Sequence, residues 1–395
     1  MMNEDRGKAG YTLVELLVVM LIFAIVMSLI SVSFARIVRS SGLLMKSAET
    51  DTGDLIGLEL MRTDLELAGF GLPWKVFSSF LETDNADKLL VDNCPGCAGA
   101  RAALYDDHND LASEPPAPTP YRIGDDVGFN GSDYLVLKGT ALGNSEASRS
   151  WCYLNYSSGT TLIKPSLSEP ELRLGKKTRT IVLKAGVAGG APTRELVMSS
   201  GTFTLTFNAP LAPEFLPKEN SDNYLVYGVA PEGSSSVLAF PFNRADYYIS
   251  RPDEMSPICN KATGILYKTV TNHTSPRTYS YNPILGCVAD MQVVLYMDTN
   301  SDGEIDYHPQ PEDHVFTPQE LREQLKEIRV YILAQQGKKD PQYRYAADSI
   351  VVGDPELDLS IGRLWSESAM RSTFGADWRN YHWKLYTIVV QPKNL

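Results

Sequence analysis

Residues 11–34 read YTLVELLVVMLIFAIVMSLISVSF, and this stretch decides how the rest of the chain is interpreted. The stretch contains one charged residue, Glu15. As an α-helix, its 24 residues extend roughly 36 Å, at about 1.5 Å per residue, which is enough to cross the hydrocarbon core of a bilayer. The sequence therefore predicts that this end of the chain meets a membrane.

Two ordinary kinds of membrane segment explain part of this pattern. A secretory signal peptide would use Arg6 and Lys8 as its charged region, with small residues at Ser33 and Ala35 before a cleavage site. Its apolar region is normally about 7–15 residues long, which is shorter than this one. A plain membrane anchor has the right length, but a charge such as that of Glu15 costs on the order of 2.5–3.5 kcal/mol at the centre of a span. Such a carboxylate normally has a partner.

A third interpretation accounts for both the length and the charge. The residues from Gly10 to Leu17 resemble the processing site of type IV pilins, in which a short polar leader ends in glycine and a glutamate is the fifth residue of the mature chain. The resemblance implies that a prepilin peptidase cleaves between Gly10 and Tyr11 and that the new N-terminus is methylated. It also implies that Glu15 pairs with the N-terminal amine of a neighbouring subunit. Tyr11 stands where the family usually has phenylalanine, and Val32 stands where many members have a proline.

Apolar residues continue at helical spacing beyond the membrane segment, at Leu55, Leu58, Met61 and Leu65. The glycines and proline of residues 69–73 predict the end of this helix. We therefore expect a leader at residues 1–10, a transmembrane half-helix at 11–34 and an amphipathic half-helix at 35–72.

The sequence after residue 72 predicts an irregular region at residues 73–132 and a β-rich head domain at residues 133–395. Short β-type runs recur in the head, and residues 202–207 alternate strictly, as a strand with one buried face does. We therefore expect an α+β fold class, and the resemblance implies a type IV pilin-like long helix packed on a large antiparallel head. Residues 65–71, 288–298 and 381–394 resemble segments of the PilW-like minor pilins, which suggests the same family for the head.

An acidic segment at residues 298–306 matches the first nine positions of an EF-hand-type calcium loop. Its candidate ligands are Asp298, Asn300, Asp302, Asp306 and the carbonyl of Glu304. Pro309 stands where the twelfth position should be glutamate. The alternative is a solvated acidic turn between two strands, because Asp, Asn and Gly are ordinary turn residues.

Five cysteines are too few for a disulfide scaffold, and their odd number leaves at most two internal disulfides. Cys259 and Cys287 lie beside strand-like runs, and we predict a disulfide between them. The close spacing of Cys94 and Cys97 favours a disulfide between them, or a disulfide from one of them to Cys152.

The sequence contains no GxSxG, HExxH, P-loop or GxGxxG motif, so we expect no enzymatic activity and no required cofactor other than the candidate Ca²⁺. Its net charge of -12 disfavours nucleic acid as a partner. The resemblance implies a minor pilin that primes or caps a type IV pilus at its tip. The alternatives are a J-type pseudopilin of type II secretion and a pilus-tip adhesin or other binding module.

The same resemblance implies where the protein is and what it meets. Its expected partners are other minor and major pilins, the prepilin peptidase, the inner-membrane assembly platform and membrane lipid. We expect a single-pass inner-membrane protein with a cytoplasmic N-terminus and a periplasmic head. We expect the protein to be incorporated afterwards into the pilus (fimbrium).

Overall fold

A computed structural model describes residues 55–76, 80–83, 102–107, 117–165, 171–188, 190–233, 237–308, 316–357 and 361–395, together with ten positions between Leu13 and Ser28. The chain divides into two compact units, Met1–Gly53 and Asp54–Leu395. In the first unit the ten described positions are helical. The second unit contains all the strands of the described chain and is the head.

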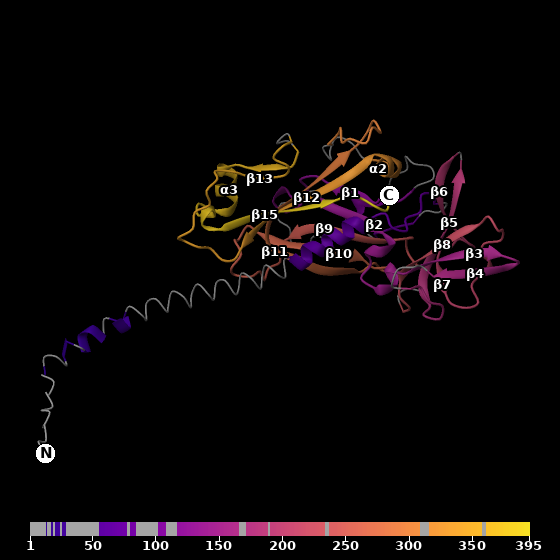
Figure 1. The fold of residues 1–395 in the computed structure, drawn as a ribbon, viewed down its shortest axis with the longest axis horizontal. Helices are drawn as coiled ribbons and strands as arrows, with labels where there is room; N and C mark the ends of the chain where they lie inside the picture. Colours follow the sequence, from indigo (N-terminus) through magenta and orange to yellow (C-terminus); the bar gives the residue numbers. More distant parts are fainter. Residues whose placement is uncertain are drawn as a thin grey trace, which may run out of the picture. The chain divides into compact units, whose positions relative to one another are not determined.

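A seven-stranded sheet forms the centre of the head (Figure 1), and all its neighbouring strands are antiparallel. Its strands, in spatial order, are β1 (Tyr121–Gly124), β2 (Tyr134–Gly139), β9 (Asn243–Ser250), β10 (Gly264–Thr271), β11 (Tyr279–Met297), β12 (Leu325–Gln336) and β15 (His382–Val390).

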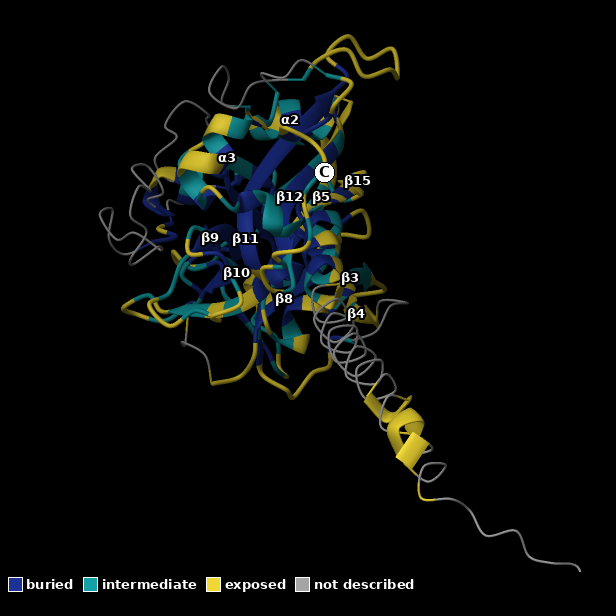
Figure 2. Cartoon of the chain, turned by 90° about the vertical axis from the view of Figure 1, so that its left-hand side faces the viewer, coloured by how far each residue is buried: buried dark blue, intermediate teal, exposed yellow. Residues whose placement is uncertain are grey.

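Both faces of this sheet are covered, which is why its central strands are dark blue, that is buried, in Figure 2. Helical residues 55–67 pack on one face through Leu58, Met61 and Leu65, which contact the main apolar core. The other face is covered by α3 (Glu367–Phe374) and by a small sheet of β13 (Ile350–Val352) and β14 (Arg363–Trp365). Strands buried on both sides explain the long apolar runs in the sequence.

A second, six-stranded sheet completes the head (Figure 1). It has the order β4-β3-β8-β5-β6, with β7 paired to β5, and its two faces contribute to two further apolar cores. Its strands are β3 (Trp151–Ser157), β4 (Thr160–Pro165), β5 (Thr178–Ala188), β6 (Ala191–Leu196), β7 (Leu205–Phe207) and β8 (Asn223–Ala230).

Short helices connect the strands. The helix α2 (Pro318–Gln324) begins with the capping box that its sequence predicts, since Thr317 and Glu320 hydrogen-bond each other's backbone NH groups. The 3₁₀ helices are η1 (Ala102–Tyr105), η3 (Phe129–Gly131), η4 (Thr140–Leu142), η5 (Glu146–Arg149), η6 (Pro213–Phe215) and η7 (Trp378–Asn380).

Helical residues 55–67 end where the sequence places the stop. Gly69 and Gly71 have φ angles of 84° and 67°, a region that glycine adopts at little cost. A side chain at Gly69 would also collide with the backbone of Asn394. The amide of Asn394 donates to the carbonyl of Glu66 at 2.7 Å, so the end of the chain is fastened to the end of the helix (Figure 1).

Two expected boundaries in the head were wrong. The sheet does not begin at residue 133, because β1 at Tyr121–Gly124 already pairs with β2. The run 202–207 forms a strand only from Leu205, although Phe203, Leu205 and Phe207 are buried in the expected alternation. In the second case the sequence pattern predicted burial correctly and hydrogen bonding incorrectly.

The region expected to be irregular, residues 73–132, also reaches the core. Glu82, Asp106 and Asp107 are buried and form ion pairs with Lys138 of β2 and Arg244 of β9. Charged groups rarely lie fully inside a protein unless they are paired. These pairs therefore join the connection after the helix to the centre of the large sheet.

Candidate functional site

The residues predicted for processing and assembly, Gly10, Tyr11 and Glu15, lie outside the described residues. Cleavage after Gly10 and the pairing of Glu15 therefore stay predictions. The structure does describe apolar neighbours of these positions. Among the described residues, no helix is both long and apolar enough to span a membrane.

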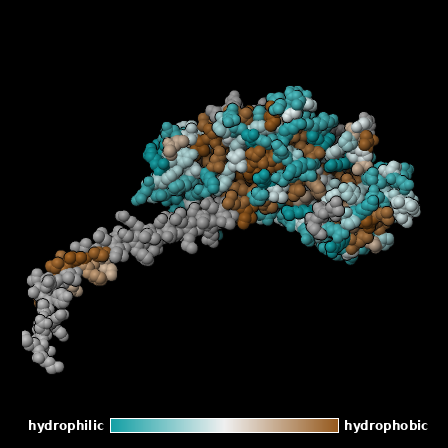
Figure 3. Space-filling model, in the orientation of Figure 1, coloured by the Kyte–Doolittle hydropathy of each residue, from teal (hydrophilic) through white to brown (hydrophobic). Residues whose placement is uncertain are grey.

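The described apolar side chains of the first unit are exposed. Leu13 is 78% exposed, Leu21 62% and Phe23 61%, whereas core residues of the head such as Leu65 are fully buried. Figure 3 shows hydrophobic surface on the described part of this segment. Exposed apolar side chains gathered on one segment normally mark contact with a membrane or another protein. The described part of the N-terminal unit thus offers an apolar surface for contact with a membrane or another protein.

The helix of the second unit is held to the head by a buried polar contact as well as by its apolar face. The Asp64 carboxylate accepts a hydrogen bond from Tyr247 Oη at 2.6 Å and lies 2.5 Å from Lys268 Nζ. All three side chains are buried. Burial and the neighbouring Asp64 charge raise the pKa of Tyr247 well above its ordinary value, so its hydroxyl stays a hydrogen-bond donor. This contact fixes the helix at one register on the sheet.

The acidic loop after β11 is closed by its own hydrogen bonds. Asp298 Oδ2 accepts from the Gly303 NH at 3.0 Å and lies 3.1 Å from Lys326 Nζ, while Asp306 accepts from the Thr299 NH at 2.9 Å. The other candidate ligands form similar bonds, since Asn300 accepts from the Asp302 NH and Asp302 accepts from the Glu304 NH. Among the described residues, no group of three or more acidic, histidine or cysteine side chains is arranged to hold a metal ion.

Calcium binding by this loop stays a prediction. If the loop binds Ca²⁺ in the way its spacing predicts, millimolar calcium should raise the melting temperature of the wild-type protein, and Asp302→Ala should abolish that rise. Thermal unfolding with calcium and with a chelator measures both. Glu254→Ala, which removes an acidic residue elsewhere in the head, is the control. If calcium does not change the melting temperature of the wild-type protein, the loop is only a turn.

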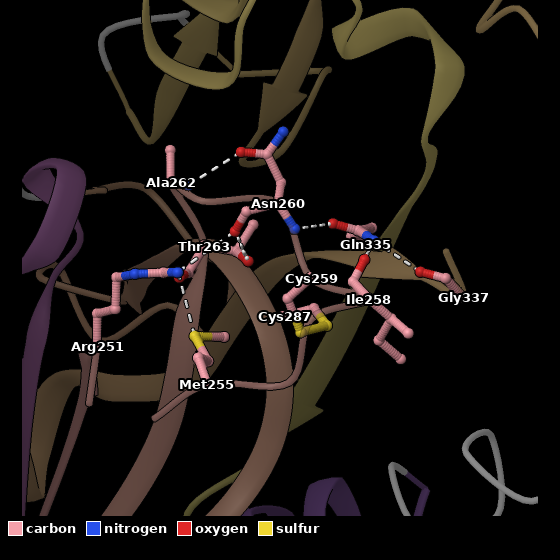
Figure 4. The surroundings of a disulfide bond; sticks show 10 residues. All are labelled: Arg251, Met255, Ile258, Cys259, Asn260, Ala262, Thr263, Cys287, Gln335 and Gly337. Atoms are coloured by element: carbon pink, nitrogen blue, oxygen red, sulfur yellow. Dashed lines mark hydrogen bonds between the residues drawn. A yellow bond between two sulfur atoms is a disulfide. The ribbon is translucent and has the colours of Figure 1, made fainter. Parts of the chain in front are cut away.

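A disulfide links Cys259 to Cys287, the pair that the sequence analysis selected (Figure 4). It joins the loop before β10 to β11. The same loop is held by Gln335 of β12, which accepts from the Asn260 NH at 2.7 Å and donates to the carbonyl of Ile258 at 2.8 Å. Cys152 is a buried free thiol, so the expected alternative of a link to it is not formed. Cys94 and Cys97 lie outside the described residues.

Peptide mapping without reductant should recover Cys259 and Cys287 in one linked pair of peptides. The bond closes a loop of sequence separation 28, and such a loop gives an ideal entropic stabilisation of roughly 3–4 kcal/mol. Replacing both cysteines by serine should lower the free energy of unfolding by a similar amount in urea. Recovery of both residues as free thiols from protein purified without reductant would refute the link.

Sequence reasoning missed two groups of polar residues. The first is the buried set around Lys138 and Arg244, and the second is Trp74 with the two arginines over its ring. A signal existed for the first group, because each of these cations lies next to a strand-like run. The sequence carried no sign of the second, whose members come together only in the folded chain.

Comparison with known proteins identifies the N-terminal segment. Residues 5–31 match the model of the prokaryotic N-terminal methylation motif. No curated protein and no solved structure matches the chain. The motif supports a type IV pilin-like or pseudopilin-like protein that is cleaved by prepilin peptidase and interacts with other pilins. It also suggests membrane anchoring and a place in the pilus.

Proposed function

We propose that this protein is a minor pilin that acts in type IV pilus assembly and primes or caps the fibre at its tip. The methylation motif at residues 5–31 carries the proposal. The exposed apolar positions of the first unit support it, because a pilin helix must contact lipid before assembly and other helices afterwards. The role is structural, and its partners are pilins and the assembly platform.

The size of the head supports a place at the tip. The second unit runs from Asp54 to Leu395 and contains two large sheets. In a helical fibre each repeating subunit has neighbours on all sides, which leaves little room for so large a domain. A subunit that begins the fibre has one side without neighbours. A low-copy initiator, which recruits major subunits beneath it, therefore fits this head best.

Three measurements test the proposal. Mass spectrometry of the mature protein should find a methylated N-terminus at Tyr11, and retention of Met1 or a start at Arg36 would contradict pilin processing. Deletion of the gene should reduce the number of surface fibres, and immunogold labelling should mark fibre ends. Label along the whole shaft at stoichiometric abundance would overturn the tip role while leaving the pilin assignment in place.

The same deletion separates the rival functions. Loss of protein secretion with intact pili would favour a J-type pseudopilin, and intact fibres that no longer attach to their target would favour an adhesin.

A further inference from the structure

Trp74 lies beneath two arginines that come from distant parts of the head. The guanidinium carbon of Arg194, in β6, is 4.5 Å from the centre of the indole ring, and that of Arg322, in α2, is 5.0 Å from it. The backbone NH of Trp74 donates to the backbone carbonyl of Arg194 at 2.8 Å, which holds this residue beside β6. We call these three residues the Trp74 cluster; α2 and β6 lie near one another at the upper right of Figure 1.

The two arginines of the cluster lack an acidic partner within the described chain. Other arginines with reduced exposure are paired, for example Arg122 with Asp107 at 2.7 Å and Arg244 with Glu82 at 2.8 Å. Neither Arg194 nor Arg322 forms an ion pair or side-chain hydrogen bond with a residue that the structure describes. The nearby carboxylates are engaged elsewhere: Glu195 pairs with Lys75 at 3.2 Å, and Glu323 accepts from Gln319 at 2.8 Å.

Folding therefore brings two like charges together over one ring. Because both guanidinium groups lie over the same indole, their separation is at most about 10 Å, roughly a Debye length at 0.1 M salt. Partial burial lowers the pKa of Arg322; the charge of Glu323 opposes this shift, and the charge of Arg194 adds to it. The indole attracts cations and so offsets part of the free-energy cost of placing the two guanidinium charges close together. A bound anion would offset the remainder of that cost.

We propose that the Trp74 cluster binds a carboxylate-bearing segment of a partner protein. The planar guanidinium groups match carboxylates in geometry, and the indole supplies an apolar surface beside them. Tryptophan and arginine are also the residues that most often dominate binding energy in protein interfaces. The net charge of -12 repels extended polyanions such as anionic membranes and nucleic acids, whereas two local charges suit one or two carboxylates. This inference is independent of the proposed pilin function.

The test uses the full chain in detergent and a short fluorescein-labelled peptide that carries two adjacent glutamates and an amidated C-terminus, and binding is followed by fluorescence anisotropy. Wild-type protein should bind the peptide, and Arg194→Gln and Arg322→Gln should each weaken binding at least fivefold. Arg322→Lys should also weaken it, because lysine keeps the charge but loses the planar stacking group. Peptide addition should change the tryptophan fluorescence of the wild type, and Trp74→Phe should remove that change. Melting temperatures confirm that each variant is folded.

Arg149→Gln is the matched control, since Arg149 is an exposed arginine outside the cluster, and it should bind the peptide as the wild type does. The proposal would be overturned if the wild type and all the variants bound the peptide with equal affinity. It would also be overturned if inorganic phosphate displaced the peptide when the two were present at the same concentration of negative charge. A Glu312→Gln/Asp313→Asn variant that binds the peptide at least tenfold more tightly would also overturn it, because the occupant would then be the chain itself.

Discussion

Arg244→Met should lower the free energy of unfolding by roughly 3–5 kcal/mol, the cost typical of breaking a buried ion pair from one side. Arg244 is fully buried in β9, and its guanidinium group contacts Glu82 at 2.8 Å, Asp106 at 2.5 Å and Asp246 at 2.8 Å. Methionine fills a similar volume but leaves these carboxylates without their cation. Urea unfolding of the full chain in detergent measures the loss.

The loss should depend on pH. Burial already raises the pKa of Glu82, and the charges of Lys138 and Arg244 oppose that rise. Without Arg244 the pKa of Glu82 in the folded protein should rise further, so the folded variant takes up a proton that the unfolded chain does not hold. Stability then increases as the pH falls through that raised pKa, and the deficit should be larger at pH 8 than at pH 5.

Arg173→Met is the control for this experiment. Arg173 is also paired, with Glu171 at 3.1 Å, but its side chain is 63% exposed, and surface pairs contribute little. The free energy of unfolding of the control variant should lie within about 0.5 kcal/mol of the wild-type value. An Arg244→Met loss no larger than that of the control would show that the buried pairs do not hold the connection to the sheet.

Glu15→Ala should reduce incorporation into fibres at least tenfold while leaving the unfolding of the head unchanged. The reason is the proposed pairing: a carboxylate inside the apolar segment is costly until the amine of a neighbouring subunit neutralises it, and that pairing selects subunits in register. Glu15 belongs to the first unit of the chain, Met1–Gly53, and the head core belongs to the second. Quantitative proteomics of sheared fibres, with urea unfolding of the same variant, measures both effects.

Glu59→Ala is the matched control, because it removes an exposed carboxylate from helical residues 55–67. It should enter fibres as the wild type does. If Glu15→Ala enters fibres equally well, the pairing of Glu15 with a neighbouring amine is wrong, and a plain anchor would explain the segment better.

Much of the local structure of the head follows from its sequence. The strands at β2, β5, β8, β9, β10, β11, β12 and β15 each contain a run that the sequence marks as β-type. The cap of α2 and the glycines at 69 and 71 also have local causes, since they satisfy backbone groups or permit a left-handed φ. Periodicity does not reveal pairing, so neither the start of the sheet at Tyr121 nor its strand order could be read in advance.

The sequence by itself determined the pilin-like character of the protein, because cleavage motif, apolar length and Glu15 are neighbours along the chain and act through local chemistry. It also selected Cys259 and Cys287 as a pair. Only the tertiary structure decided which charges are buried and which lie side by side. Lys138 meets Glu82 across 56 positions, and Arg194 and Arg322 meet over Trp74, because the packing of two sheets and a helix sets those contacts. Such contacts have no period or motif, since their free energy depends on burial and on neighbours that folding alone supplies.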